Sequence, residues 1–124
     1  MRVLIVDDSK FMREFLRLHL QAMQIQCDEV STGGEALQLL ERGAVYQLML
    51  LDWNMPGISG VECLEECRRR HLAPAMKVMM VTSEADHVRV QRALDVGADE
   101  FLMKPFSRES LCEKLTMLGF DAAA

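Results

Sequence analysis

The sequence lacks three features that would assign it to common functional classes. No apolar run approaches the roughly 20 residues that a membrane-spanning helix needs, and the N-terminus lacks the long apolar region of a signal peptide. No tract rich in lysine or arginine dominates, and the formal net charge is -5, which does not favour nucleic acid as a direct partner. We therefore expect a cytoplasmic protein with no membrane partner and no direct nucleic-acid partner.

The sequence also lacks a redox motif. Its four cysteines are scattered, and Cys63 and Cys67 are four residues apart on one predicted helix rather than in a Cys-X-X-Cys pair. We expect all four thiols to be buried and reduced. The one basic run, residues 68–71, closes the same predicted helix, where positive charge suits the negative end of the helix dipole.

The order of apolar patterns predicts one α/β domain. The chain has 124 residues and is 50% hydrophobic, which suits a single core over residues 1–120 followed by a short tail at 121–124. Short apolar runs alternate with longer segments of helical periodicity. The expected strands are 2–6, 26–30, 47–52, 76–81 and 99–102, and the expected helices are 9–22, 33–42, 60–70, 86–96 and 108–118.

Polar residues mark three of the predicted helix starts. Thr32 with Glu35, and Ser59 with Glu62, have the spacing of capping boxes. Ser107 is placed to cap the last helix. Strands and helices in strict alternation predict a doubly wound parallel sheet with helices on both faces, and ligands then bind beyond the carboxyl ends of the strands.

Reactive side chains stand at the ends of four predicted strands. Asp7 and Asp8 follow the first strand, Asp52 ends the third, Thr82 follows the fourth and Lys104 follows the fifth. Because the carboxyl ends of parallel strands share one edge of the sheet, we expect these groups to form one site. Each motif alone is explained by a loop, a cap or a turn. Their combined order favours a single mechanism.

Three crowded carboxylates repel one another, which would raise their pKa values unless a cation binds. Mg²⁺ (or Mn²⁺) takes one or two carboxylates together with water and phosphate oxygens. We expect Asp8 and Asp52 to be direct ligands and Asp7 to act through water. The backbone carbonyl of Asn54 would complete the protein's ligands.

With a cation in place, Asp52 can do covalent chemistry. A carboxylate attacks phosphorus and becomes an aspartyl phosphate. The charge that develops on the transferred group needs positive partners and donors, which Lys104 and Thr82 can supply. Pro105 biases the backbone of Lys104 away from helix and permits a cis peptide bond.

In order and spacing, these motifs resemble the receiver domains of two-component response regulators. The resemblance covers essentially the whole chain, and the strings at 53–56 and 82–85 are especially similar to CheY-like receivers. The matching motifs are Asp7-Asp8, Asp52 with Met55-Pro56-Gly57, Thr82, and Lys104-Pro105.

The resemblance implies a flavodoxin-like sheet with strand order 2-1-3-4-5. It implies that Asp52 accepts a phosphoryl group from a sensor histidine kinase or a phosphotransfer protein. It places Mg²⁺ at Asp7, Asp8, Asp52 and the Asn54 carbonyl. The protein would catalyse only its own phosphorylation and dephosphorylation, and would not be an enzyme acting on a separate substrate. Chemotaxis is one pathway that such a protein could serve.

The resemblance also assigns regulatory positions. Asn54 and Glu84 match two positions that tune hydrolysis of the aspartyl phosphate, and their residue types imply a short-lived phosphorylated state. Thr82 and Phe101 match the switch residues, although CheY-like proteins often have tyrosine where Phe101 stands. A phenylalanine can rotate inward but makes no hydroxyl hydrogen bond. The face built from residues 84–118 would bind the downstream protein.

Three alternatives stay open at this point. A flavin-binding electron carrier shares the architecture, but the carboxylates of the loop at 7–11 would repel its phosphate. A phosphatase with an aspartate nucleophile would have a second aspartate two residues after the first, where this chain has Asn54. Inside the family, the chain is either a single-domain regulator or a receiver cut from a longer protein.

Overall fold

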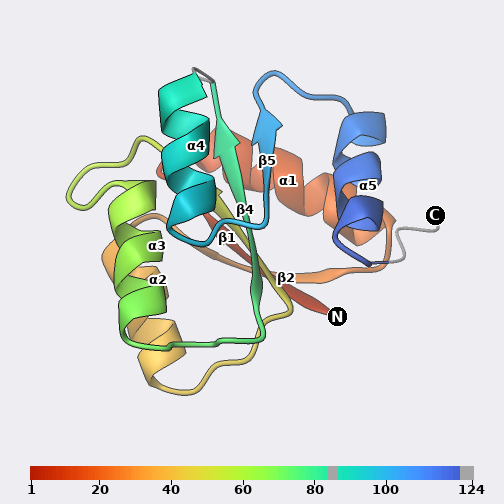
Figure 1. Cartoon of the computed structure of the whole chain (residues 1–124). Helices are drawn as coiled ribbons and strands as arrows, with labels where there is room; N and C mark the ends of the chain where they lie inside the picture. The colour runs from red at the N-terminus through yellow and green to blue at the C-terminus, as the bar shows by residue number, and fades with distance from the viewer. Residues whose placement is uncertain (84–86, 121–124) are drawn as a thin grey trace.

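The computed structural model describes residues 1–83 and 87–120 and contains one five-stranded parallel sheet of order β2-β1-β3-β4-β5 (Figure 1). This confirms the expected fold and strand order. The expected start of the fourth helix and the expected tail at 121–124 include residues outside the described ranges. In chain order the elements are β1 (Arg2–Val6), α1 (Lys10–Ala22), β2 (Gln26–Val30), α2 (Gly33–Glu41), β3 (Leu48–Asp52), α3 (Gly60–Arg69), β4 (Lys77–Thr82), α4 (His87–Asp95), β5 (Glu100–Met103) and α5 (Arg108–Met117).

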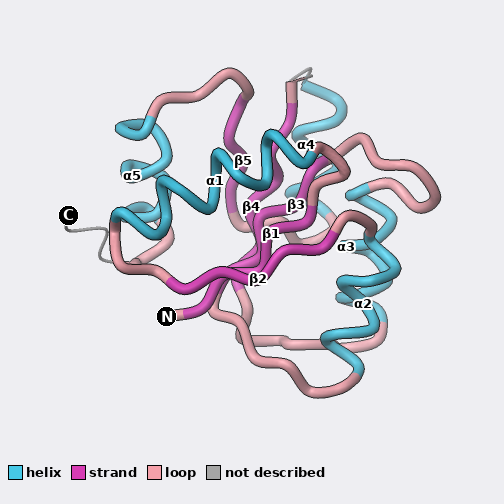
Figure 2. Tube along the Cα trace, turned by 180° about the vertical axis from the view of Figure 1, so that it is seen from behind, coloured by secondary structure: helices cyan, strands magenta, loops and turns pink. Residues whose placement is uncertain are grey.

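Helices cover both faces of the sheet (Figures 1 and 2). Side chains alternate along a strand, so Val3 and Ile5 pack with α1 and α5, whereas Leu4 and Val6 pack with α2, α3 and α4. The central strand β3 is buried along its whole length. The chain reverses its direction of travel across the sheet between β1 and β3, and this reversal opens a crevice at the carboxyl edge.

The helix starts confirm two of the three predicted caps. Ser59 and Glu62 form a complete capping box at α3, and Ser107 caps α5. The predicted box at α2 is only half formed. Thr32 Oγ1 accepts from the Glu35 backbone N–H, but Glu35 Oε1 accepts from the hydroxyls of Ser31 and Thr32. The neighbouring Ser31 hydroxyl thus offers this carboxylate a partner that the sequence prediction did not consider.

The prediction that all four thiols are buried is wrong for two of them. Cys63 and Cys67 are buried on the inner face of α3, but Cys27 and Cys112 are only partly buried. Cys27 lies on β2, an edge strand with a neighbour on one side only. All four are free thiols. Within the described residues, no helix is long and apolar enough to cross a membrane.

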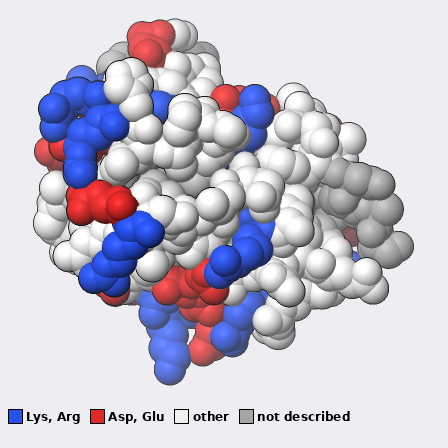
Figure 3. Space-filling model, turned by 90° about the horizontal axis from the view of Figure 1, so that it is seen from below, with Lys and Arg blue, Asp and Glu red and all other residues white. Residues whose placement is uncertain are grey.

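Charged side chains of opposite sign lie beside one another on the surface. Arg70 pairs with Glu41, and Arg92 pairs with Glu65. Seen from below, basic and acidic side chains are interspersed and do not form a field of one sign (Figure 3). The basic run ends α3, as the sequence predicts.

Gly60 is required by a close approach between α3 and the end of β3. Its N–H donates to the Trp53 carbonyl at 2.9 Å. A Cβ atom at this position would lie 2.0 Å from the carbonyl oxygen of Asp52. Only glycine therefore lets the helix begin against the strand end that carries Asp52.

We expect Gly60→Ala to lower the free energy of unfolding by about 3 kcal/mol, because the methyl group must displace the backbone at Asp52. Urea denaturation followed by circular dichroism measures this change. Gly34→Ala is the matched control, because its Cβ would meet nothing closer than 3.9 Å and alanine favours a helix by about 0.5–1 kcal/mol. Equal stability of the two variants would contradict the steric explanation.

Candidate functional site

The register of the sheet brings the predicted residues together at the upper edge of Figure 1, where the arrowheads of β4 and β5 point. Val6 pairs with Leu51, so the residues that follow in sequence, Asp7 and Asp52, stand side by side. Thr82 pairs with Met103, which places Lys104 just beyond the ladder. The site is therefore built by strand pairing rather than by contacts near in sequence.

Lys104 joins two of the carboxylates. Its Nζ donates to Asp7 Oδ2 at 3.2 Å and to Asp52 Oδ1 at 3.3 Å. Asp7 is 2% exposed and Asp52 is 7% exposed, so the ammonium balances charges that water reaches poorly. The peptide bond between Lys104 and Pro105 is cis.

The third carboxylate, Asp8, is exposed at the mouth of the site. One carboxylate oxygen from each of Asp7, Asp8 and Asp52 lies within 4.8 Å of the others, and this is the only such acidic group that the described residues form. An all-oxygen donor set of this size suits a hard divalent cation. Asn54 lies exposed on the loop that follows β3.

Main-chain contacts fix the loop that carries the acidic pair. The Ser9 N–H donates to Asp7 Oδ1 at 2.9 Å, and the Ser9 hydroxyl caps α1 by accepting from the Met12 N–H. The Arg13 guanidinium donates to the Asp7 carbonyl oxygen at 2.7 Å. Sequence reasoning missed Arg13, because a bond from a side chain to a main-chain carbonyl leaves no residue-type signature at the acceptor.

The pKa of Asp52 is raised to about 6, chiefly because burial disfavours the charged form and next because the negative charge of Asp7 lies close by. The Lys104 charge and hydrogen bond act in the opposite direction, and the charge of Asp8 adds a smaller upward effect. The sequence analysis predicted that crowding raises the pKa values of these carboxylates. The pKa of Asp52 is indeed raised, but desolvation is the largest cause. A cation bound beside Asp52 would therefore stabilise the charged form of this carboxylate.

The other predicted residues lie around this cluster. Thr82 is buried at the end of β4, and its carbonyl accepts the Lys104 backbone N–H at 2.7 Å. Phe101 is half-buried against the core shared with α2, α3 and α4, and Lys114 Nζ lies 4.9 Å from its ring centroid. Glu84 lies outside the described residues, as does the start of the predicted partner face at 84–118. Trp53, next to Asp52, is buried beneath the Arg89 guanidinium.

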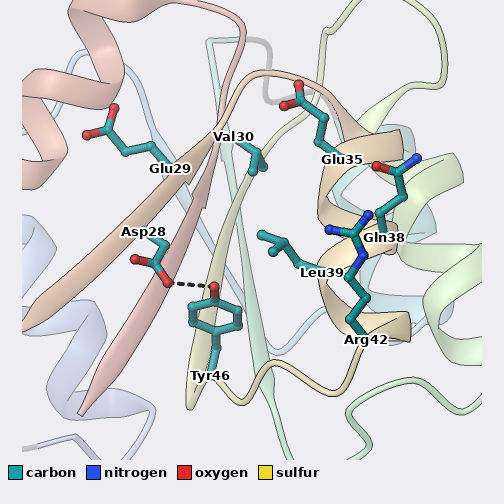
Figure 4. A pocket seen from close by; sticks show the side chains of 8 residues that line it. All are labelled: Asp28, Glu29, Val30, Glu35, Gln38, Leu39, Arg42 and Tyr46. Atoms are coloured by element: carbon teal, nitrogen blue, oxygen red, sulfur yellow. Dashed lines mark hydrogen bonds between the residues drawn. The ribbon is translucent and has the colours of Figure 1, made fainter.

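A separate hollow of about 380 Å³ lies between β2 and α2, and Figure 4 shows its lining. The Tyr46 hydroxyl donates to Asp28 Oδ2 at 2.7 Å across its floor. None of its lining residues belongs to the carboxylate cluster. The cluster, rather than this hollow, thus holds the residues that the sequence singled out.

Comparison with known proteins decides the family. The sequence profile of the response regulator receiver domain matches residues 3–116 of this chain. The chain belongs to the response regulator receiver family. Receiver domains act in two-component signalling and are signalling proteins rather than classical enzymes. This membership supports neither the flavin carrier nor the phosphatase alternative.

Individual relatives agree with this assignment. Chemotaxis protein CheY-3 of Vibrio cholerae is 33% identical over 116 residues, which cover 93% of this chain and 88% of that protein. The phosphate regulon transcriptional regulatory protein PhoB of Rhizobium meliloti is 31% identical over 115 residues, which cover 92% of this chain. The match spans 50% of PhoB, so the activity of that whole protein does not transfer to this receiver.

Solved structures show the same CheY-like fold. CheY4 of Vibrio cholerae superposes with a TM-score of 0.86 at 30% identity, covering 94% of this chain and 96% of that chain. A CheY-like receiver domain from Methanospirillum hungatei gives a TM-score of 0.86 at 32% identity, covering 94% and 91%.

The raised pKa of Asp52 predicts that, without a metal ion, this carboxylate lowers the free energy of unfolding by an amount that depends on pH. Because the folded-state pKa lies above the ordinary value, the protonated form is favoured in the fold, and stability is lost as the pH rises through about 6. We expect Asp52→Asn to remove this penalty and to raise the free energy of unfolding at pH 7.5 by about 1–2 kcal/mol, with a smaller gain near pH 4.5.

Urea titrations at the two pH values in EDTA measure the difference between Asp52→Asn and the unchanged protein. Glu14→Gln, which removes an exposed carboxylate of α1, should alter stability by less than about 0.5 kcal/mol at either pH. A gain from Asp52→Asn that is the same at both pH values would show that the carboxylate is not penalised by its surroundings.

Proposed function

We propose that this receiver is a phosphorylatable switch in which Asp52 accepts a phosphoryl group from a phosphohistidine. The donor is a sensor histidine kinase or a phosphotransfer protein. The observation that carries this proposal is the convergence of three carboxylates with Lys104, whose ammonium bridges Asp7 and Asp52. The expectation of a cytoplasmic location stays a prediction.

Mg²⁺ or Mn²⁺ is the proposed cofactor, held by Asp7, Asp8, Asp52 and the Asn54 carbonyl. The fit rests on the clustered carboxylate oxygens and on the raised pKa of Asp52, to which burial contributes most and the charges of Asp7 and Asp8 contribute further. The bound cation would neutralise phosphoryl oxygens. The receiver domain of the Pseudomonas aeruginosa sensor kinase PA1611, solved with a magnesium ion in its active-site cleft, shares the fold at 23% identity.

In the proposed reaction, a carboxylate oxygen of Asp52 forms a bond to phosphorus as the bond from phosphorus to the donor's imidazole nitrogen breaks. The nitrogen keeps the electron pair, and the donor ring, protonated on its other nitrogen, leaves as a neutral imidazole. Lys104 exchanges its bonds to the carboxylates for contact with the phosphoryl oxygens, and the Thr82 hydroxyl donates to another of them. The burial of Asp52 limits attack on the product by bulk water.

The rim of the crevice supports a protein donor. Phe11, on the first turn of α1, is 74% exposed, and its ring stacks with Phe15. Phe15 in turn packs edge-on against Phe106, which follows Lys104 by two residues. These rings and Pro105 line an apolar hollow of about 150 Å³. A protein that brings a phosphohistidine to Asp52 would cover this surface, whereas a small phosphodonor would leave it exposed.

The proposed output is a change of the partner face at residues 84–118, driven by Thr82 and Phe101. Exposed apolar side chains on the described part of this face give a partner something to bind: Val88 is 79% exposed, Leu94 is 42% exposed and Met103 is 45% exposed. Without a hydroxyl group, Phe101 contributes through ring packing alone. The similarity of this chain to CheY proteins favours a chemotaxis-type pathway. The match to PhoB supports the alternative of a receiver within a longer regulator.

Beryllofluoride, which occupies the position of a phosphoryl group on an aspartate, tests the central step. We expect Mg²⁺ with beryllofluoride to change the fluorescence of Trp53, the only tryptophan in the chain and the neighbour of Asp52. Acetyl phosphate should label the protein covalently. Asp52→Asn should lose both responses, and EDTA should abolish them in the unchanged protein. If Asp52→Asn responds as the unchanged protein does, Asp52 is not the acceptor.

Asn54 and Glu84 predict a short-lived aspartyl phosphate. In excess Mg²⁺, phosphoprotein freed from its donor should decay within minutes to an hour, and mass spectrometry at timed intervals measures the loss. Asn54→Ala serves as the comparison, because it removes the tuning amide and leaves the backbone carbonyl in place. Persistence of the unchanged phosphoprotein for many hours would rule out this prediction.

A further inference from the structure

Arg13 contacts the acidic loop without belonging to the carboxylate cluster. It lies on the second turn of α1, and its side chain is 17% exposed. Its Nη1 donates to the Asp7 carbonyl oxygen at 2.7 Å, and its Nε donates to Glu29 Oε1 at 3.3 Å. One guanidinium therefore ties the end of β1 to the edge strand β2.

The hydrogen bond from Arg13 Nη1 is important for the site because of the oxygen that accepts it. The Asp7 carbonyl belongs to the peptide unit that joins Asp7 to Asp8, so holding its oxygen fixes that peptide plane. On the other side of Asp8, the Ser9 N–H is held by Asp7 Oδ1. The exposed Asp8 therefore stands between two anchored peptides, which set the direction in which its side chain leaves the backbone.

Glu29 keeps Arg13 in place. Its Oε1 faces Arg13, and its Oε2 pairs with Arg17 Nη1 at 3.2 Å. Figure 4 shows the Glu29 side chain pointing away from Leu39 and Tyr46, toward α1. Because Glu29 is shared by Arg13 and Arg17, its carboxylate offsets only part of the positive charge that Arg13 brings near the cation site.

We propose that Arg13 is a positioning residue of the metal site. By holding the Asp7 carbonyl it orients the Asp7–Asp8 peptide and presents the Asp8 carboxylate to a divalent cation, an inference that rests on the proposed function of the cluster. A planar guanidinium suits this task because it donates to two acceptors in fixed directions, which an ammonium does not.

A positioning role and a purely electrostatic role for Arg13 predict opposite changes in cation affinity when Arg13 is replaced by a neutral residue. Removing a positive charge close to a cation site strengthens cation binding by Coulomb attraction alone. Removing a contact that orients a metal-binding side chain weakens cation binding. Loss of such a supporting contact typically lowers metal affinity by about tenfold or more. The sign of the change therefore separates the two roles.

The test titrates the ¹⁵N-labelled full chain with Mg²⁺ and follows its backbone amides by NMR. We expect Arg13→Gln to weaken Mg²⁺ binding about tenfold and Arg13→Lys to weaken it about threefold, because lysine keeps the charge but loses the paired geometry. Before any metal is added, the Asp8 and Ser9 amide signals should move in Arg13→Gln, while signals of the distant helix α3 stay in place.

Arg17→Gln is the matched control. Arg17 lies one turn further along α1, carries the same charge and pairs with the same Glu29, but it does not contact Asp7. This variant should bind Mg²⁺ within twofold of the unchanged protein.

The outcomes are distinct. If the unchanged protein binds no Mg²⁺, the proposed function of the cluster fails. If it binds Mg²⁺ and Arg13→Gln binds as tightly or more tightly, the positioning role alone fails. Should Arg13→Gln not fold, Arg13→Lys decides, since affinity equal to that of the unchanged protein would overturn the proposal.

Discussion

Repulsion among carboxylates is the constraint on which the rest of this structure depends. Asp7, Asp8 and Asp52 converge at the edge of the sheet, and two of them are nearly inaccessible to water. A nearby positive charge lowers the cost of such a cluster, and the surrounding backbone must hold its carboxylates in place. Lys104 supplies the balance in the absence of a metal ion, while Gly60 and the buried strand β3 supply the frame. The three carboxylates carry more negative charge than the single Lys104 ammonium balances, so a further cation would lower their repulsion.

The sequence predicted most of the fold because its local signals agree with the final packing. The apolar run that becomes β3 is buried on both faces, and Ser59 with Glu62 forms the expected cap. The failures come from groups whose partners the sequence does not specify. Glu35 bonds to hydroxyls instead of completing its predicted box, and Cys27 stays only partly buried because its strand lies at the edge. Asp7, Asp52 and Lys104 could be predicted together because strand register, rather than side-chain detail, joins them.

Family membership and the particular behaviour of this chain are different levels of explanation. The receiver fold places reactive groups at strand ends, and many regulators share that frame. Around that frame this chain carries an aromatic rim beside the crevice, a phenylalanine beneath Lys114, and two arginines that pair with Glu29. Family membership therefore accounts for the arrangement of the strand ends, while the two proposals above concern the side chains around them.

The main-chain hydrogen bond from the Lys104 N–H to the Thr82 carbonyl has a mechanical consequence. It couples the peptide units that carry the hydroxyl donor and the ammonium donor, so neither can shift without pulling on the other. The tips of β4 and β5 are thus tied together at the edge of the sheet where Asp7 and Asp52 also lie. A residue inserted between Met103 and Lys104 would give that hydrogen bond to a different N–H and would separate the Lys104 and Thr82 side chains, although both remained in the sequence.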